Sequence, residues 1–147
     1  MPDSPNKKNP LLNNNRFTHL LPADVEVWKK FLDSPANIYT NFDYDVRVGD
    51  GRDPGPGFTE EIRRLGVLLS QRRIDAIGHH PTHIAIIEIT RVAGFKALGQ
   101  LTAYPLLYTM KYKPDLPLKS ILVAQEVQTD ALVAFHREGI AVLTFNP

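Results

Sequence analysis

Two strongly apolar segments separated by a short loop lie within residues 71–104, and each carries a single carboxylate. Residues 74–78 contain Asp75, and residues 84–90 contain Glu88. Both segments are rich in β-branched residues and are bounded by turn-forming residues, which predicts strands that are buried on both faces. An acid inside a buried strand needs a physical reason, so these two positions constrain the whole chain.

The loop at residues 80–83 determines how the two strands pair. Pro81 cannot take the positive φ of the tightest hairpin turns, so we expect a four-residue loop around a type I turn with Pro81 second. Such a loop places Asp75 opposite Glu88, with Cβ atoms roughly 4.5–5.5 Å apart, whereas a three-residue loop would shift the register. Facing like charges require a proton, a basic side chain or a cation between them, and two carboxylates plus water are typical of magnesium sites.

A helix is predicted directly after the second strand. Lys96, Gln100 and Tyr104 follow one another in it at i, i+4 spacing, a row whose edge can lie over the two acids. Thr90 stands two residues after Glu88 and therefore points to the same face of the strand. The sequence thus predicts one polar cluster built from two strands and a helix.

The order Asp, spacer, Glu-x-Thr and Gln-x-x-x-Tyr resembles the PD-(D/E)xK nuclease superfamily, in its branch with a downstream QxxxY helix. The resemblance extends over roughly residues 20–145. In that pattern the Asp and Glu bind a metal, and a Lys two residues after the Glu positions the attacking water. The resemblance therefore implies a Mg²⁺ or Mn²⁺ site held by Asp75, Glu88 and the carbonyl of Ile89, with Gln100 and Tyr104 orienting substrate or ligands.

Thr90 stands at the position of the family's lysine. A hydroxyl cannot supply the fixed positive charge that stabilises an attacking hydroxide, and loss of such a group typically costs a factor of about 10² to 10³ in rate. Lys96 and Arg91 are the candidate replacements. Arg72, Arg73 and Arg91 are also candidate contacts to a DNA backbone, with pairing to Glu60, Glu61 and neighbouring acids as an equal alternative for the arginines near the first of these strands.

The beginning of the chain differs from the rest. Residues 1–18 are polar and rich in Asn and Pro, so we expect a flexible N-terminal arm ahead of a single nuclease-like domain over residues 19–147. Residues 22–33 predict the first helix. Glu26 on this helix is the resemblance's candidate for a third metal ligand, although its i+3 and i+4 neighbours are lysines, as on a solvated face.

Residues 38–48 alternate in polarity and predict a strand with one face toward the core. On this reading Ile38 points inward, while Tyr39, Asp43 and Asp45 point outward. Paired acids on the wet face of an outer strand indicate solvation rather than a metal site.

Residues 49–58 form a Gly- and Pro-rich loop that cannot be regular structure, and it lacks the context of a phosphate-binding loop. Thr59 can cap a short helix over residues 60–65, after which residues 67–69 read as helical or extended. The hairpin tip carries three histidines that we expect to be exposed, namely His79, His80 and His83.

Pro105 lies inside the helix predicted over residues 95–111. It removes the hydrogen bond to the carbonyl of Leu101 and should kink the helix. The predicted fold is α/β, a restriction-endonuclease-like mixed central sheet flanked by helices in the order α-β-β-β-α-β-α-β. Its last elements are a strand over residues 120–124, a helix capped by Thr129 or Asp130 that ends near residue 138, and a strand over residues 140–145.

Composition narrows the classes of function. The 147 residues are 43% hydrophobic, enough for one core, and the net charge of +1 means that DNA contact must come from local clustering. The absence of Cys excludes disulfides and thiolate metal sites. No apolar run has the length of a membrane span or signal peptide. We therefore expect no membrane partner and no secretion through a signal peptide, and the similarity to short, phage-encoded members of the family implies a location in a host cytoplasm or a virion.

Two hypotheses follow. The first is a magnesium-dependent DNA endonuclease that uses Asp75 and Glu88, with Lys96 or Arg91 replacing the motif lysine. The second is a non-catalytic, phage-encoded descendant with a degraded site, because the short one-domain form is most similar to phage-encoded members. It would be a DNA-associated virion component, such as a head-tail connector subunit docked through its N-terminal arm, and we then expect a homo-oligomer. The sequence slightly favours the second hypothesis.

Overall fold

The computed structural model describes residues 19–146, so the predicted arm over residues 1–18 lies outside the described part of the chain. No helix within the described part has the length and apolar character needed to cross a membrane. The elements follow one another as α3 (Pro22–Leu32), β1 (Asn41–Val48), α4 (Glu60–Ser70), β2 (Arg72–His80), β3 (His83–Ala93), α5 (Phe95–Tyr112), β4 (Leu118–Val127), α6 (Thr129–Arg137) and β5 (Ala141–Thr144).

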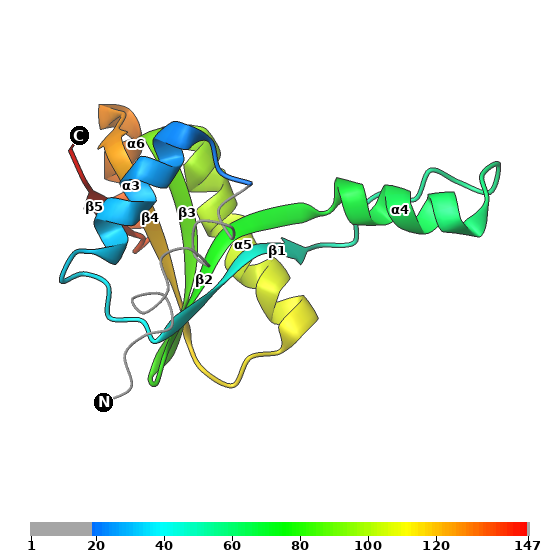
Figure 1. The fold of residues 1–147 in the computed structure, drawn as a ribbon, viewed down its shortest axis with the longest axis horizontal. Coiled ribbons are helices and arrows are strands. Elements are labelled where there is room, and N and C mark those ends of the chain that lie inside the picture. The colour runs from blue at the N-terminus through cyan, green and yellow to red at the C-terminus, as the bar shows by residue number, and fades with distance from the viewer. Residues whose placement is uncertain (1–18, 147) are drawn as a thin grey trace.

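The strands form one mixed sheet in the order β1-β2-β3-β4-β5 (Figure 1). β1, β2 and β3 are antiparallel neighbours, whereas β4 and β5 continue the sheet in parallel with β3. This confirms the predicted fold class. The element order gains one helix, α4: the short helix expected over residues 60–65 runs on to Ser70, because residues 67–69 continue it instead of extending.

The register of the central hairpin is the predicted one. Ala76 pairs with Ile87, and His80 pairs with His83, so the pairing is symmetric about the 81/82 bond. The strands run further than expected and leave only Pro81 and Thr82 between them. Among the described non-glycine residues, positive φ occurs only at Asp45 and Lys113, so this turn avoids the conformation that Pro81 forbids.

Helices cover both faces of the sheet. α3 buries Val27, Trp28 and Phe31 against one face, where Trp28 stacks on Phe31 with ring centroids 4.9 Å apart. α5 and α6 cover the other face, and Leu101 and Phe135 are fully enclosed there. Burial on both faces explains why β2 and β3 read as continuous apolar runs.

The predicted facing of the first strand is wrong at its start. Ile38 is 54% exposed and Tyr39 only 5%, and the strand begins at Asn41. The Tyr39 ring packs so closely on Gly78 that a Cβ there would lie 2.9 Å from it. Further along, Tyr44 joins the apolar cluster under α3 and Val46 the cluster under α5. Asp45, at φ 55°, lies between them and switches the strand from one face to the other.

His83 also departs from its prediction. It is 4% exposed rather than free at the hairpin tip. Its Nε2 lies 2.9 Å from the Tyr39 hydroxyl, and its ring stacks on His80 at 4.7 Å. Burial lowers the pKa of His83, so the ring is neutral and serves packing.

Ser120 compensates for the proline inside α5. Pro105 has no N–H to donate to the carbonyl of Leu101, as the sequence predicted. The Ser120 hydroxyl on β4 donates to that carbonyl over 3.0 Å instead. The sheet thereby satisfies the one acceptor that the proline leaves open, and α5 continues to Tyr112.

The end of β3 is tied to the start of α6. The N-cap of α6 is Gln128 rather than Thr129 or Asp130, and it makes no side-chain cap. Its backbone N–H donates to the carbonyl of Ala93 over 2.8 Å, while its side chain lies against Gly94, where a Cβ would be 2.4 Å from the amide oxygen. This close approach fixes the turn from which α5 begins.

Candidate active site

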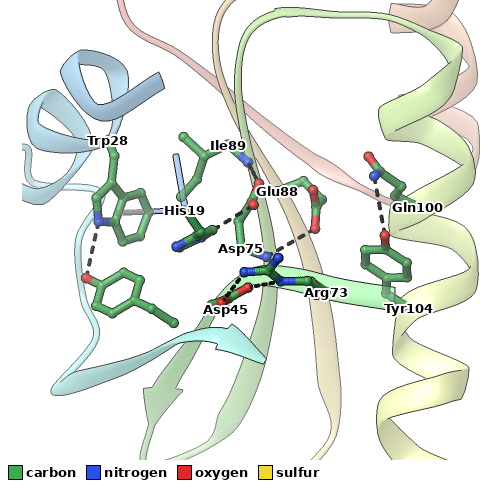
Figure 2. Close-up of polar contacts among 10 residues, drawn as sticks. His19, Trp28, Asp45, Arg73, Asp75, Glu88, Ile89, Gln100 and Tyr104 are labelled. Carbon is green, nitrogen blue, oxygen red and sulfur yellow. Dashed lines mark hydrogen bonds and ion pairs between the residues drawn. The ribbon is translucent and has the colours of Figure 1, made fainter. Parts of the chain in front are cut away.

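Asp75 and Glu88 lie side by side on β2 and β3 and bond to each other's strand (Figure 2). The N–H of Asp75 donates to Oε1 of Glu88 over 3.3 Å, and the N–H of Ile89 donates to Oδ2 of Asp75 over 2.9 Å. The hairpin register produces this arrangement, since the last paired residues are Ala76 and Ile87 and the two acids come directly after them on the two strands. The sequence prediction that the two acids meet is confirmed.

Burial raises the pKa values of both acids, and their mutual repulsion adds to this effect at Glu88. Glu88 is only 6% exposed, and burial, followed by the charge of Asp75, raises its pKa well above the ordinary value. Burial also raises the pKa of Asp75, against the hydrogen bond from Ile89. Two carboxylates this close in a mostly buried site cannot both be ionised cheaply, so each disfavours the ionised form of the other unless a cation lies between them.

The two acids open into a cavity of about 310 Å³ between the N-terminal ends of α3 and α5. Its wall is formed by the start of α3 and the residues before it, by β2, by β3 and by the start of α5, and it contains both polar and apolar residues. The polar side chains that line it are His19, Asp24, Asp75, Glu88, Thr90, Lys96 and Gln100.

The predicted row on α5 reaches this cavity. Lys96 and Gln100 line it, and the charge of Lys96 lowers the pKa of Glu88 against the larger effect of burial. Gln100 donates to the Tyr104 hydroxyl over 3.3 Å. Burial and then the charge of Glu88 raise the pKa of Tyr104, so the phenol is a neutral hydrogen-bonding group.

Thr90, at the position of the motif lysine, lines the cavity, whereas Arg91, the other candidate replacement, does not. Thr90 lines the cavity, and its hydroxyl donates to the carbonyl of Val92 over 3.4 Å. Arg91 is exposed and contributes no lining to the cavity, and its backbone N–H donates to Asp24 over 2.8 Å. Among the candidates for the replacement cation, Lys96 is therefore the one placed in the cavity.

Two residues of the cavity were missed by sequence reasoning. Nε2 of His19 lies 3.6 Å from Oδ1 of Asp75 (Figure 2), and it is buried without a hydrogen-bond partner among residues 19–146. Asp24, in the first turn of α3, also lines the cavity, and burial raises its pKa. The helix therefore presents Asp24 to the site, whereas Glu26 is exposed and absent from the lining. The acid-rich helix start was the available signal for Asp24, and no sequence pattern pointed to His19.

Some basic residues near the start of β2 form ion pairs with acids of the chain, whereas others are exposed without such a pair among residues 19–146. Arg73 forms a two-pronged ion pair with Asp45, which lowers the pKa of that acid. Arg63 likewise holds Asp53 at 2.7 Å. Arg72 is exposed and enters no ion pair among residues 19–146. Of the proposed DNA contacts, Arg72 and Arg91 are thus open and Arg73 has an internal partner.

The donor set fits a hard divalent cation. Asp75 and Glu88 offer carboxylate oxygens at one point, and the raised pKa of both acids marks a place where a positive charge would be favourable. Within residues 19–146, no group of three acids or histidines comes close enough to form a full metal cluster. Magnesium is commonly held by one or two carboxylates and keeps several waters, so two acids and the Ile89 carbonyl are a sufficient protein contribution.

Comparison with known proteins bears on the fold. No family model and no curated protein matches the chain. Among solved structures, EndoMS in complex with double-stranded DNA superposes with a TM-score of 0.50 at 19% sequence identity, over 87% of this chain and 46% of EndoMS. The chain thus spans about half the length of that neighbour. At this identity the likeness establishes the architecture alone, and the chain has a restriction-endonuclease-like α/β fold.

Proposed function

We propose that the protein is a divalent-cation-dependent DNA endonuclease that cleaves phosphodiester bonds at the cavity between α3 and α5. The observation that carries this proposal is the pair of the half-buried Asp75 and the buried Glu88, side by side on central strands, with Lys96 lining the same cavity. A fold without chemistry gains nothing from two facing acids in its core, because their repulsion destabilises it.

Asp75, Glu88 and the Ile89 carbonyl would hold Mg²⁺ or Mn²⁺. A cation bound there supplies a Lewis acid for a phosphoryl oxygen and lowers the pKa of a bound water. The protein's part is to keep both acids fixed by the backbone N–H groups of the opposing strand. That rigidity lets the acids receive the cation without rearrangement.

Lys96 takes the role of the motif lysine in this proposal. It lies one residue inside α5, so its ammonium adds to the positive end of the helix dipole. Positive charge at this point stabilises an attacking hydroxide and the charge that develops on the phosphate. Gln100, held to Tyr104, supplies amide groups that can orient substrate on the same side.

DNA is the proposed substrate for two reasons. The structural neighbour EndoMS was solved bound to double-stranded DNA. In this chain the exposed Arg72 and Arg91 lie on the two strands that carry the acids, within three residues of Asp75 and Glu88 respectively. Guanidinium groups so placed can contact the phosphates on either side of a scissile bond.

Plasmid nicking tests the proposal. Supercoiled plasmid is incubated with Mg²⁺ or Mn²⁺ and with wild type, Asp75→Ala or Lys96→Ala, and Lys29→Ala on the exposed side of α3 is the matched control. We expect nicking by wild type and the control, and loss of about 10² to 10³ in rate in the site variants. Equal nicking by all four proteins would rule the site out.

The second candidate is a non-catalytic, DNA-associated protein with a degraded site. The observation in its favour is Thr90, whose hydroxyl bonds to the backbone where the family pattern has a lysine. Its concrete form is the phage virion component of the second hypothesis, docked through residues 1–18. This candidate predicts DNA binding by gel shift that survives Glu88→Gln, with no nicking by wild type in either metal.

A further inference from the structure

α4 turns an apolar face to solvent. No residue of this helix is buried, although its sequence is strongly amphipathic. Figure 1 shows α4 standing away from the sheet at the far end of β1 and β2. The large apolar side chains on this face keep between 43% and 67% of their surface exposed, and they are Phe58 just before the helix, Ile62, Leu65, Leu68 and Leu69.

The opposite side of α4 is already occupied by the loop that precedes it. Arg63 holds Asp53 through a bidentate contact, and Gly66 packs against Pro54. Gly51 approaches so closely that a Cβ would lie 2.3 Å from the carbonyl of Val67. The loop therefore fixes the helix by its polar side and leaves the apolar side facing outward.

The apolar positions have the spacing of a helix–helix seam. Phe58, Ile62, Leu65 and Leu69 follow one another at intervals of four, three and four residues, the pattern by which two helices interlock side chains. We propose that this face pairs with α4 of a second copy of the chain, in an antiparallel, two-fold symmetric arrangement with Leu65 near the axis.

The size of the patch fits a dimer. Aromatic side chains present roughly 150–250 Å² and aliphatic ones less, so the exposed fractions leave on the order of 400 Å² of apolar surface on α4, within the range of the largest patch on a monomer. Symmetric pairing would bury on the order of 800 Å² of apolar surface in total, and with a polar rim the interface would pass the area of about 1,000 Å² that a biological interface should clear. A two-fold axis satisfies both patches at once, because each patch then covers the other.

Charge favours a second copy in the antiparallel direction. Glu60 and Glu61 stand in the first turn of α4, and Arg72 opens β2 two residues after the helix ends at Ser70. Within residues 19–146, neither Glu61 nor Arg72 enters an ion pair. Antiparallel pairing brings the acidic start of each helix to the end of the other helix that leads into Arg72, and the helix dipoles oppose favourably as well. Parallel pairing would set the acids against each other.

Sedimentation tests the interface on the full chain. Wild type is compared with Leu65→Glu and with Val133→Glu, a matched control because Val133 is a 71% exposed aliphatic residue on α6. We expect dimers for wild type and the control, and monomers for Leu65→Glu with an unchanged circular dichroism spectrum. A monomeric wild type would overturn the proposal, which would leave the face to another kind of partner. Dimers that persist in Leu65→Glu would overturn it equally.

Crosslinking tests the direction of pairing. The chain has no cysteine, so Leu65→Cys introduces a single thiol. A residue near a two-fold axis faces its own copy at a distance that a disulfide can span. We expect rapid oxidation of Leu65→Cys to a covalent dimer and slow oxidation of Val133→Cys. Equal rates for the two variants would overturn the antiparallel seam.

Discussion

Asp75 and Glu88 are each held by the backbone of the other's strand. Oε1 of Glu88 accepts from the N–H of Asp75, and Oδ2 of Asp75 accepts from the N–H of Ile89, next to Glu88. Neither acid can relieve the repulsion by swinging away without giving up a buried hydrogen bond. The pair is therefore rigid and short of positive charge, which is the property that a cation site requires.

Replacement of Glu88 by Gln separates stability from cation binding. We expect Glu88→Gln to unfold at the same or a higher temperature without metal, because the repulsion with Asp75 is removed. Mg²⁺ or Mn²⁺ should raise the melting temperature of wild type, since a ligand of the folded state stabilises it, and should fail to do so in the variant. The measurement is a thermal melt with and without each metal. If neither metal changes the melting temperature of wild type, the prediction is contradicted.

The pH dependence of stability should carry the signature of Glu88. A buried acid with a raised pKa binds more protons when folded, so its contribution to the free energy of unfolding falls as pH rises above its ordinary value of 4.5. We expect wild type to lose stability relative to Glu88→Gln as pH increases through that window. Saturating Mg²⁺ should shrink the loss, because the cation replaces the proton.

Urea unfolding of both proteins at each pH measures this difference. Asp45 and Asp53, whose pKa values are lowered by Arg73 and Arg63, stabilise the fold in the opposite direction, above their unfolded values. Their effects are common to both proteins and cancel in the difference. A constant difference between wild type and variant across pH would show that folding leaves the pKa of Glu88 unchanged, and would contradict the prediction.

Much of the site could be predicted because local rules determine it. The turn at Pro81 fixes the register of two strands, and the register fixes where Asp75 and Glu88 meet. The helical repeat then places Lys96 and Gln100 on one side of α5. Each of these steps spans only a few residues, so the sequence alone was sufficient for them.

The remaining features depend on packing between distant segments. His19 reaches Asp75 across more than fifty positions, and no periodic pattern records such a contact. The alternation of the first strand gave the wrong facing for Ile38 and Tyr39 because both residues precede the strand, which begins at Asn41, and the Tyr39 ring packs on Gly78 of β2. The length of α4 was underestimated because residues 67–69 are apolar and could be read as an extended segment. In the structure they continue the helix, and none of its residues is buried in the core.

Lys96 should govern the rate rather than cation affinity. We expect Lys96→Ala to lower nicking by about 10² to 10³ while the metal-induced rise in melting temperature persists. Thr90 lines the same cavity, so Thr90→Lys in the Lys96→Ala background should restore part of the activity by returning a cation to the site. Nicking rates and melts of the single and double variants check both statements. Lys29→Arg is the control for the second substitution, and it is also made in the Lys96→Ala background. Activity that is restored by Lys29→Arg but not by Thr90→Lys would contradict the assignment.

Ser120 should matter to stability because of Pro105. The Ser120 hydroxyl supplies the hydrogen that the Leu101 carbonyl cannot receive from a proline, so Ser120→Ala should lower the free energy of unfolding by about 1–3 kcal/mol. In a Pro105→Ala background the restored N–H satisfies that carbonyl, and Ser120→Ala should then cost about 1 kcal/mol less.

Thr102→Ala is the control for this prediction. The Thr102 hydroxyl bonds to the Leu98 carbonyl in a regular stretch of α5, and its loss should lower the free energy of unfolding by under about 0.5 kcal/mol. Urea unfolding of the four proteins in the cycle, with the control alongside, measures the coupling. An equal cost of Ser120→Ala in both backgrounds would mean that the hydroxyl stabilises the fold by some means other than the carbonyl that the proline leaves open.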